Sequence, residues 1–366
     1  MIRIVFWILS FTFLPWLLST SNIASAEDAG VLRVGVIAPF SGDAATFGNS
    51  IRHGMEIAFA KLDPAVRDSI DLRFEDDALV PVRTVSAFRF LKSSYQPDVV
   101  ISVASGTSNA LAPVAETTGT PLIAVASDPA ICRGRKHVVN FWVTPETEAQ
   151  LLVQELKRRG IRRVTRVVTE HDGTIAVARA MDAEPGAPEV VLSEEIPNQV
   201  RDFRPFLLKA KKQDFDGFVV ILLPGQVGLF ARQAREQRFS QQLIGIETFE
   251  DLSEVKSSGG ALIGGWFVTG ASPEGRFAAE FAMKHPGESA AVAAAGHDIV
   301  KLLGVGVSTG ALQLTDDVAP KLRQYLHSVK DFTGASGVFS STDDNRFTLP
   351  ATVKVVTSNG FEEQNR

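Results

Sequence analysis

The sequence predicts an α/β protein in which doubly wound parallel sheets are divided between two lobes. Its strand candidates, such as residues 32–39 and 217–224, are continuous runs of Val, Ile and Leu. Runs without polar alternation are typical of strands that are buried on both faces of a sheet. Helical patterns separate these runs almost throughout, as in βαβ units. About eight strands with intervening helices exceed one compact sheet, so two domains suit a chain of 366 residues better.

The elements are predicted in order along the chain. The strand candidates are residues 32–39, 70–77, 98–105, 120–127, 163–170, 217–224, 242–248 and 264–270. The helical patterns between them are residues 48–62, 82–93, 108–118, 146–159, 203–212 and 226–237. An extended piece at 142–150 predicts the crossing into the second domain, and residues 265–275 predict the return. The Gly-, Ser- and Asp-rich stretch 332–347 predicts a hairpin and a turn.

The first 26 residues have the pattern of a cleaved export signal. Arg3 supplies a positive start, residues 5–18 are almost wholly apolar, and small residues precede a cleavage point after Ala26. The alternative is a membrane anchor, but the apolar run is shorter than the roughly 20 residues that a spanning helix needs. We therefore expect an exported, soluble mature protein.

Composition and motifs exclude several classes of function. The formal net charge is −5 and the basic residues are scattered, which argues against a nucleic-acid partner. A single cysteine, Cys132, allows no internal disulfide, and we interpret it as an unreactive thiol in a loop. The chain has no phosphate-binding glycine motif and no local His or acidic spacing typical of a metal site. We therefore predict no cofactor and no metal.

Short polar residues follow the first-domain strands, where an open parallel sheet binds its ligands. Ser41, Gly42 and Phe47 follow the first strand, residues 105–110 the third, and residues 126–130 the fourth. These loops should converge at one sheet edge. Unpaired N–H groups at helix starts favour anions there, so the edge suits an uncharged or carboxylate-bearing small ligand.

Each of these signals also has a purely structural interpretation. Ser108 is a plausible N-cap of the helix that follows it. Asp128 with Pro129 makes a good N-cap and first helical position. Phe47 suits a hydrophobic core as well as a binding site.

Glu247 is the notable residue of the second domain. It follows an apolar strand and would point into a cleft if the two domains face each other. A partly desolvated carboxylate there would need a cation such as an ammonium group. The alternative is an ordinary solvated acid in a loop.

Residues 34–63, 101–130 and 222–249 resemble the periplasmic leucine/isoleucine/valine-binding protein family. Two later stretches, 297–303 and 331–347, resemble a helix and a glycine turn of the same family. The resemblance extends over residues 32–363, nearly all of the mature chain. These type I periplasmic binding proteins deliver solutes to ABC importers, and no single motif among those cited is diagnostic of them.

The resemblance implies a fold of two α/β lobes joined by hinge strands, with the ligand trapped between them. It implies an N-terminal lobe of residues 31–144 and 271–345 and a C-terminal lobe of residues 145–270 and 346–366. It also implies a monomer in the periplasm that binds a small-molecule solute and docks on an ABC permease in the inner membrane.

The resemblance also assigns candidate ligand-binding residues. The hydroxyl that holds a ligand carboxylate falls on Ser105, and the aromatic residue that covers the ligand falls on Phe47. The family's Ala-Thr pair falls on Ala126 and Ser127 if this loop is one residue short. An ungapped pairing would instead use Asp128, whose charge would repel a carboxylate; the gapped version keeps the Pro in place and retains a hydroxyl.

The remaining candidate positions include departures from the family. The ammonium-binding glutamate falls on Glu247. Leu223 stands where an aromatic residue is usual, and His297 where Tyr is common. The loop 169–177 is short and lacks the family's Tyr-Gly. The amino-acid pole is thus kept while the pocket wall differs, which puts leucine-type specificity in doubt.

From these residues we predict a solute-binding protein of an ABC importer, specific for an amino acid or a related polar or amphipathic compound, and not an enzyme. One alternative is a periplasmic module that senses a ligand for a receptor or regulator. A secreted α/β hydrolase is the other, although residues 105–110 lack the Gly-x-Ser-x-Gly frame of a nucleophile elbow.

Overall fold

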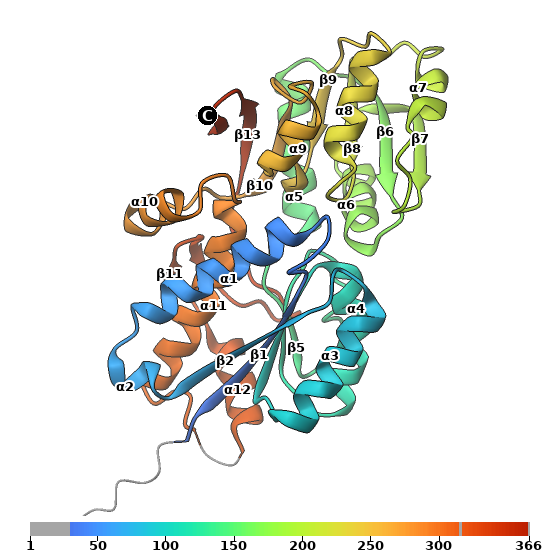
Figure 1. Cartoon of the computed structure of the whole chain (residues 1–366). Helices are drawn as coiled ribbons and strands as arrows, with labels where there is room; N and C mark the ends of the chain where they lie inside the picture. The colour runs from blue at the N-terminus through green and yellow to red at the C-terminus, as the bar shows by residue number, and fades with distance from the viewer. Residues whose placement is uncertain (1–29, 315–316, 365–366) are drawn as a thin grey trace, which may run out of the picture.

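The computed structural model describes residues 30–314 and 317–364, and these form two lobes stacked end to end (Figure 1). Each lobe has its own sheet between layers of helices, as the sequence predicts. The proposed signal segment, residues 1–26, lies outside the described residues.

The first lobe is built on a five-stranded parallel sheet in the order β2-β1-β3-β4-β5. Its strands are β1 (Leu32–Ala38), β2 (Ile70–Asp76), β3 (Val99–Val103), β4 (Leu122–Val125) and β5 (Val138–Asn140). Its helices are α1 (Ala45–Ala60), α2 (Pro64–Arg67), α3 (Pro81–Ser94), α4 (Ser105–Thr117), α11 (Ala290–Ser308) and α12 (Val318–Ser328). A hairpin of β11 (Phe332–Gly334) and β12 (Gly337–Phe339) completes it.

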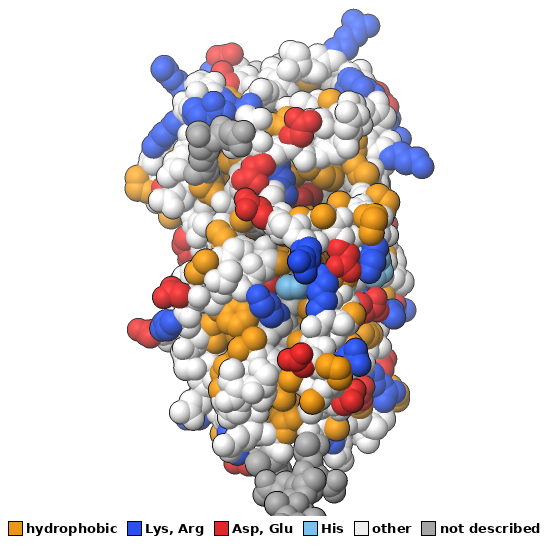
Figure 2. Space-filling model, turned by 90° about the vertical axis from the view of Figure 1, so that its left-hand side faces the viewer, with side chains coloured by type: hydrophobic (Ala, Val, Ile, Leu, Met, Phe, Trp, Pro, Cys, Tyr) orange, Lys and Arg blue, Asp and Glu red, His pale blue; other side chains and the backbone are white. Residues whose placement is uncertain are grey.

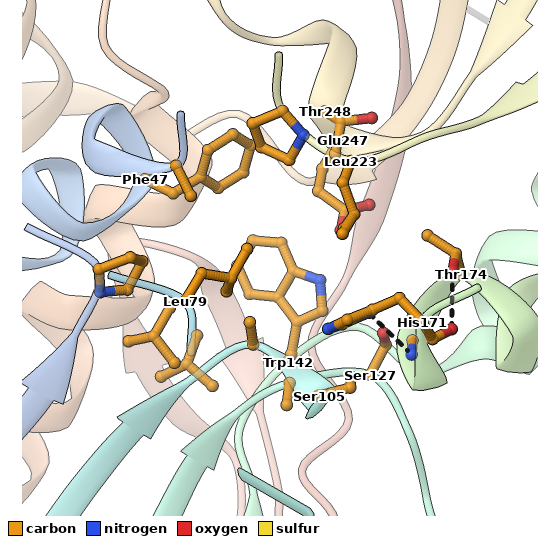
Figure 3. A pocket seen from close by; sticks show the side chains of 18 of the residues that line it. Phe47, Leu79, Ser105, Ser127, Trp142, His171, Thr174, Leu223, Glu247 and Thr248 are labelled. Carbon is orange, nitrogen blue, oxygen red and sulfur yellow. Dashed lines mark hydrogen bonds between the residues drawn. The ribbon is translucent and has the colours of Figure 1, made fainter. Parts of the chain in front are cut away.

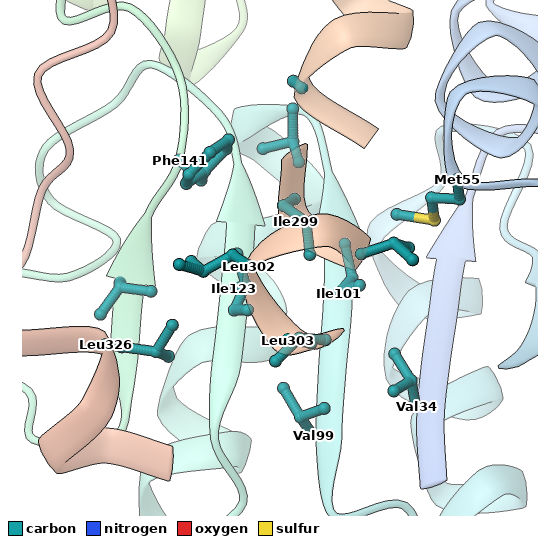
Figure 4. Packing of buried hydrophobic residues seen from close by; sticks show 14 of the residues in the cluster. Val34, Met55, Val99, Ile101, Ile123, Phe141, Ile299, Leu302, Leu303 and Leu326 are labelled. Atoms are coloured by element: carbon teal, nitrogen blue, oxygen red, sulfur yellow. The ribbon is translucent and has the colours of Figure 1, made fainter. Parts of the chain in front are cut away.

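Successive side chains of a strand point to opposite faces, and this divides the first lobe's core in two. Val34 and Ile101 face α1, α11 and α12, whereas Ile37 and Val100 face α3 and α4. Figure 4 shows the first of these cores, with side chains of α11 lying between those of the strands. Both faces are therefore apolar, which explains the unbroken Val/Ile runs of the sequence.

The second lobe has a seven-stranded sheet in the order β14-β13-β10-β9-β8-β6-β7. Its strands are β6 (Arg163–Thr169), β7 (Glu189–Ile196), β8 (Gly217–Ile221), β9 (Gln242–Gly245), β10 (Trp266–Gly270), β13 (Ala351–Thr357) and β14 (Gly360–Glu363). All neighbouring strands pair in parallel except β13, which pairs antiparallel with both β10 and β14. Its helices are α5 (Pro145–Arg158), α6 (Asp172–Ala183), α7 (Arg204–Ala210), α8 (Val227–Glu236) and α9 (Leu252–Ser257). Cores lie on both faces of this sheet as well.

The chain passes between the lobes after β5, after β10 and after β12. The segment after β10 begins with α10 (Gly275–Lys284) and continues into α11 of the first lobe. Elements far apart in sequence are thereby packed together: α11 lies against α1 so closely that an added Cβ on Gly54 or Gly296 would collide with backbone of the other helix. The exact hinge residues stay a prediction.

By length and composition alone, α11 is apolar enough to cross a membrane. In this fold, however, 72% of that helix segment is buried within the protein. Its apolar character is therefore explained by its position between α1 and the first sheet.

Several elements escape prediction from the sequence. β5 has only three residues, and β7 is an edge strand whose side chains are mostly partly exposed.

The two helix-capping interpretations are not confirmed. Ser108 is not an N-cap, because α4 begins at Ser105 and the Ser108 hydroxyl is buried 2.7 Å from that of Ser102. Asp128 does not start a helix either; its carboxylate accepts a bond from the backbone N–H of Ala130 in a turn.

Candidate ligand-binding site

A pocket lies between the two lobes, with a volume of about 740 Å³ including its open mouth (Figure 3). Both lobes contribute, and most of the wall is apolar. The lining residues are Pro39, Ala44, Phe47, Leu79, Val103, Ala104, Ser105, Val125, Ala126, Ser127, Trp142, His171, Gly173, Thr174, Leu223, Pro224, Ile246, Glu247, Thr248 and Val292.

The first-lobe side of the pocket presents hydrogen-bonding groups where β3 ends and α4 begins. Ser105 is the first residue of α4, and its hydroxyl accepts a bond from the backbone N–H of Asp128 at 3.2 Å. The Ser127 hydroxyl lies beside it in the pocket wall. Because the first N–H groups of a helix have no partner within the helix, this side is suited to a carboxylate.

His171 of the second lobe reaches across to this helix start. Its Nε2 lies 3.1 Å from the backbone nitrogen of Gly106, and its Nδ1 lies 3.3 Å from that of Gly173. A neutral imidazole has one acceptor nitrogen, so it cannot accept both bonds at once. Burial lowers the pKa of His171 despite the opposing charges of Asp172 and Asp128. One of the two N–H groups is therefore left for another acceptor.

Glu247 is the charged group of the second-lobe side. It opens a single 3₁₀ turn, Glu247–Phe249, just beyond β9. Its Oε2 is buried and has no hydrogen-bond partner, and the same holds for the Thr248 hydroxyl. Burial, with a smaller contribution from the charge of Glu250, raises the pKa of Glu247 to about 7.

A second buried carboxyl, Glu148 of α5, lies near Glu247 but outside the pocket lining. Both of its oxygens are buried without a hydrogen-bond partner. Burial raises the pKa of Glu148 well above its usual range; the charge of Glu247 adds to this rise, and the Trp142 indole opposes it. This side of the cleft thus has two acidic groups and no cation bonded to either one in the described chain.

The apolar wall combines aromatic and aliphatic side chains of both lobes. Phe47, Leu79 and Trp142 come from first-lobe segments and Leu223 from the loop after β8 (Figure 3). Leu79 has a φ of 61°, which is rare for a residue with a side chain. Its backbone N–H is bonded to the Asp77 carboxylate at 2.9 Å, so this conformation is held by the local turn.

Polar contacts at the rim hold the lobes together. Asn109 of α4 donates to Asp172 of α6 at 2.8 Å, and Arg201 pairs with Asp43 across the cleft at 2.8 Å. With the His171 contact, these bonds bring the lobes into direct contact, as in a closed conformation.

The structure brings six of the seven predicted site residues to one pocket. They are Phe47, Ser105, Ala126, Ser127, Leu223 and Glu247. Whether they bind a ligand stays a prediction. Asp128 does not line the pocket, and its carboxylate instead accepts a bond from Asn109 at 2.6 Å.

The prediction for His297, the seventh candidate residue, needs correction, because the structure places its side chain outside the pocket lining. Its Nδ1 lies 2.9 Å from Asp298, and its ring packs on Phe277 at 4.6 Å between centroids. The position in α11 points this side chain at α10 rather than into the cleft.

Sequence reasoning missed His171, Leu79 and Trp142. His171 stands just beyond the carboxyl end of β6, where a parallel sheet binds its ligands, so its position could have revealed it. Leu79 and Trp142 carry no such signal, because their roles depend on the turn after β2 and on the crossing after β5.

Comparisons with known proteins agree with this architecture. The model of a family described as "Periplasmic binding protein" matches residues 31–360. No curated protein matches the chain. A leucine-binding protein from Thermotoga maritima is 21% identical with a TM-score of 0.83, over 92% of this chain and 98% of that one.

Two ligand-bound structures have the same fold. A branched-chain amino acid substrate-binding protein from Streptococcus pneumoniae, in complex with isoleucine, is 20% identical with a TM-score of 0.79, over 92% of this chain and all of that one. A solute-binding protein of an ABC transporter from R. palustris, in complex with benzoate, is 20% identical with a TM-score of 0.81, over 92% and 96%.

These identities show the fold alone. The family match covers most of the chain, and the chain therefore belongs to the periplasmic binding protein family.

Proposed function

We propose that this member of the periplasmic binding protein family is the solute-binding protein of an ABC importer, and that it captures an amino acid with an apolar side chain. The solute carboxylate would bind at the start of α4, its ammonium group at Glu247, and its side chain against Phe47 and Trp142. The proposal includes export to the periplasm and docking on an inner-membrane permease.

The observation that carries this proposal is the unpartnered Glu247 Oε2, which is buried in a pocket whose opposite side offers N–H and hydroxyl donors. Leaving a buried carboxylate without a cation is costly, and an ammonium group supplies both the charge and the hydrogen bonds. The distribution of donors on one side and acceptors on the other matches the two ends of an amino acid.

A second candidate solute is an aromatic carboxylic acid without an amine. The aromatic wall favours it, and a structural neighbour was solved with benzoate. With its pKa raised to about 7, Glu247 is protonated at mildly acidic pH and would then donate a hydrogen bond to a neutral group of such an acid.

Opposite pH dependences distinguish the two solutes. An amino acid needs the ionised form of Glu247, so its affinity should fall as the pH is lowered from 8 to 6. An aromatic acid is repelled by the ionised form, so its affinity should rise over the same interval. Isothermal titration calorimetry at the two pH values gives the sign.

The first experiment is a thermal-shift screen of the mature protein against apolar amino acids, amides, aliphatic acids and aromatic acids. A solute at a hundredfold excess over its Kd stabilises the folded state by roughly 2.7 kcal/mol. A shift with amino acids but not with their decarboxylated or deaminated analogues supports the proposal. A shift with aromatic acids alone contradicts the amino-acid assignment.

Two other functions remain to be tested. Reconstitution with the permease distinguishes import from sensing, because only an importer component stimulates ATP hydrolysis in the presence of solute. A hydrolase would need a nucleophile bonded to a base; in the described chain, no hydrogen bond joins His171 to Ser105 or Ser127. A negative esterase and amidase screen would dismiss it.

A further inference from the structure

Two histidines and a glutamate meet outside the pocket. His53 lies in α1, His285 directly follows α10, and Glu288 lies in the loop before α11. One ligand atom from each of these three residues lies within 4.8 Å of the others, and no other group of this kind was found in the described residues.

The ligand atoms of the cluster lie near one another, and two of them are in direct contact. His53 Nδ1 lies 2.9 Å from Glu288 Oε2, and the two imidazole rings stack at 3.8 Å between centroids. Ligand atoms at about 2.0–2.1 Å from a tetrahedral Zn²⁺ lie roughly 3.3 Å apart. The three ligand atoms now lie within 4.8 Å of one another, so an ion would have to draw them together. The two rings, which are 13° from parallel, would also have to turn so that a nitrogen of each points at the same centre.

The cluster also has free electron pairs. His53 uses one ring nitrogen toward Glu288, and no hydrogen bond engages either ring nitrogen of His285 in the described chain. All three residues are partly exposed, so that an ion has access from solvent. Histidine is visible at the surface of the face that carries α10, among Lys, Arg, Asp and Glu side chains (Figure 2).

We propose that His53, His285 and Glu288 bind a divalent transition metal of the Zn²⁺ class. Two imidazole nitrogens and one carboxylate oxygen form a donor set that suits Zn²⁺. Mg²⁺ and Ca²⁺ suit it less, because they favour oxygen ligands. Three protein ligands leave a further position for water. Local sequence spacing cannot reveal this site, because 232 positions separate His53 from His285.

The location gives the site a structural consequence. The loop that carries Glu288 contacts the second lobe: Gly287 packs on Leu252 of α9, and the Ser289 hydroxyl donates to Glu250 at 3.1 Å. A bound metal would therefore connect α1 of the first lobe to a segment that also touches the second lobe.

Without a metal, the His53–Glu288 contact is an ordinary hydrogen bond between two segments. The experiment must therefore detect coordination as well as stability. We suggest stripping the mature protein with a chelator and titrating it with Zn²⁺ by calorimetry and with Co²⁺ by visible absorption. The expected result is one ion per chain, with Co²⁺ d–d bands that Zn²⁺ removes.

Substitutions within the cluster test whether the ion binds there. His53→Ala and His285→Asn should each weaken Zn²⁺ binding at least about tenfold and abolish the Co²⁺ bands. His327→Ala, at a histidine of α12 outside the cluster, should leave both unchanged. If His53→Ala does not fold, the His285→Asn result decides. Equal binding by all variants, or no Co²⁺ bands in the wild type, would overturn the proposal; neither result depends on the solute.

Discussion

The two sides of the pocket differ in how fully their polar groups are bonded within the protein. On the first-lobe side, Ser105 and the N–H of Gly106 already contact Asp128 and His171. On the second-lobe side, Glu247 Oε2 and the Thr248 hydroxyl are buried with no partner. The described chain therefore already bonds part of the first-lobe side and leaves donors there for a carboxylate, whereas the second-lobe side needs a group that the described chain does not supply.

The largest expected effect is on the stability of the ligand-free protein. The pKa of Glu247 is raised to about 7 in the fold, so the folded state binds its proton more tightly than the unfolded state. The contribution of the protonated Glu247 carboxyl to the free energy of unfolding is therefore complete below about pH 4.5, and it is lost as the pH rises through about 7. Glu247→Gln should gain up to about 3 kcal/mol over the wild type above pH 7.

Chemical denaturation of both proteins at pH 5 and pH 8 measures this difference. Glu195→Gln, at an exposed residue of β7, is the matched control and should follow the wild type. A Glu247→Gln variant with no gain at pH 8 would mean that the carboxyl is well solvated or already paired.

The second largest effect is expected on solute affinity, from a residue on the first-lobe side of the pocket. Ser105→Ala removes a hydroxyl from the start of α4 and should weaken binding of the cognate solute by about 1–3 kcal/mol. Ser108→Ala, on the same helix but bonded to Ser102 away from the pocket lining, should alter stability and leave affinity unchanged. Calorimetry on both variants tests this, and equal losses of affinity would argue against a direct contact by Ser105.

A smaller effect is expected for His171, which bonds the two sides to each other. His171→Ala removes one hydrogen bond between the lobes, worth about 0.5–1.5 kcal/mol, and should shift the ligand-free protein toward open conformations. Small-angle scattering should then show a larger radius of gyration without solute and the wild-type value with it. An unchanged ligand-free radius would show that the imidazole contact does not hold the lobes together.

The smallest effect is expected at the rim. Asp43→Asn breaks the exposed ion pair with Arg201, and such pairs contribute about 0–1 kcal/mol. Solute affinity should change less than threefold, and any change should vanish in 0.5 M salt. A larger, salt-independent loss would place Asp43 in the binding machinery.

The fold and one polar residue on each side of the pocket could be predicted from the sequence, whereas residues whose position depends on packing between distant elements could not. Continuous apolar runs such as that of β1 predict two-sided burial, and the rule that ligands bind beyond strand ends led to Ser105 and Glu247. Glu148 could not be found in this way, since its burial depends on how α5 packs beside Glu247. His297 was misplaced because a helical position has no direction until its neighbouring helices are known.

The central claim is that a cationic group of the solute pairs with Glu247 in the closed cleft. Calorimetry at pH 7 in two buffers of different ionisation enthalpy tests it most directly, because it counts the protons exchanged on binding. With a pKa of about 7, Glu247 is half protonated before binding, so an amino-acid solute should release about half a proton in the wild type and none in Glu247→Gln. Proton uptake by the wild type, or equal release by both proteins, would contradict the account.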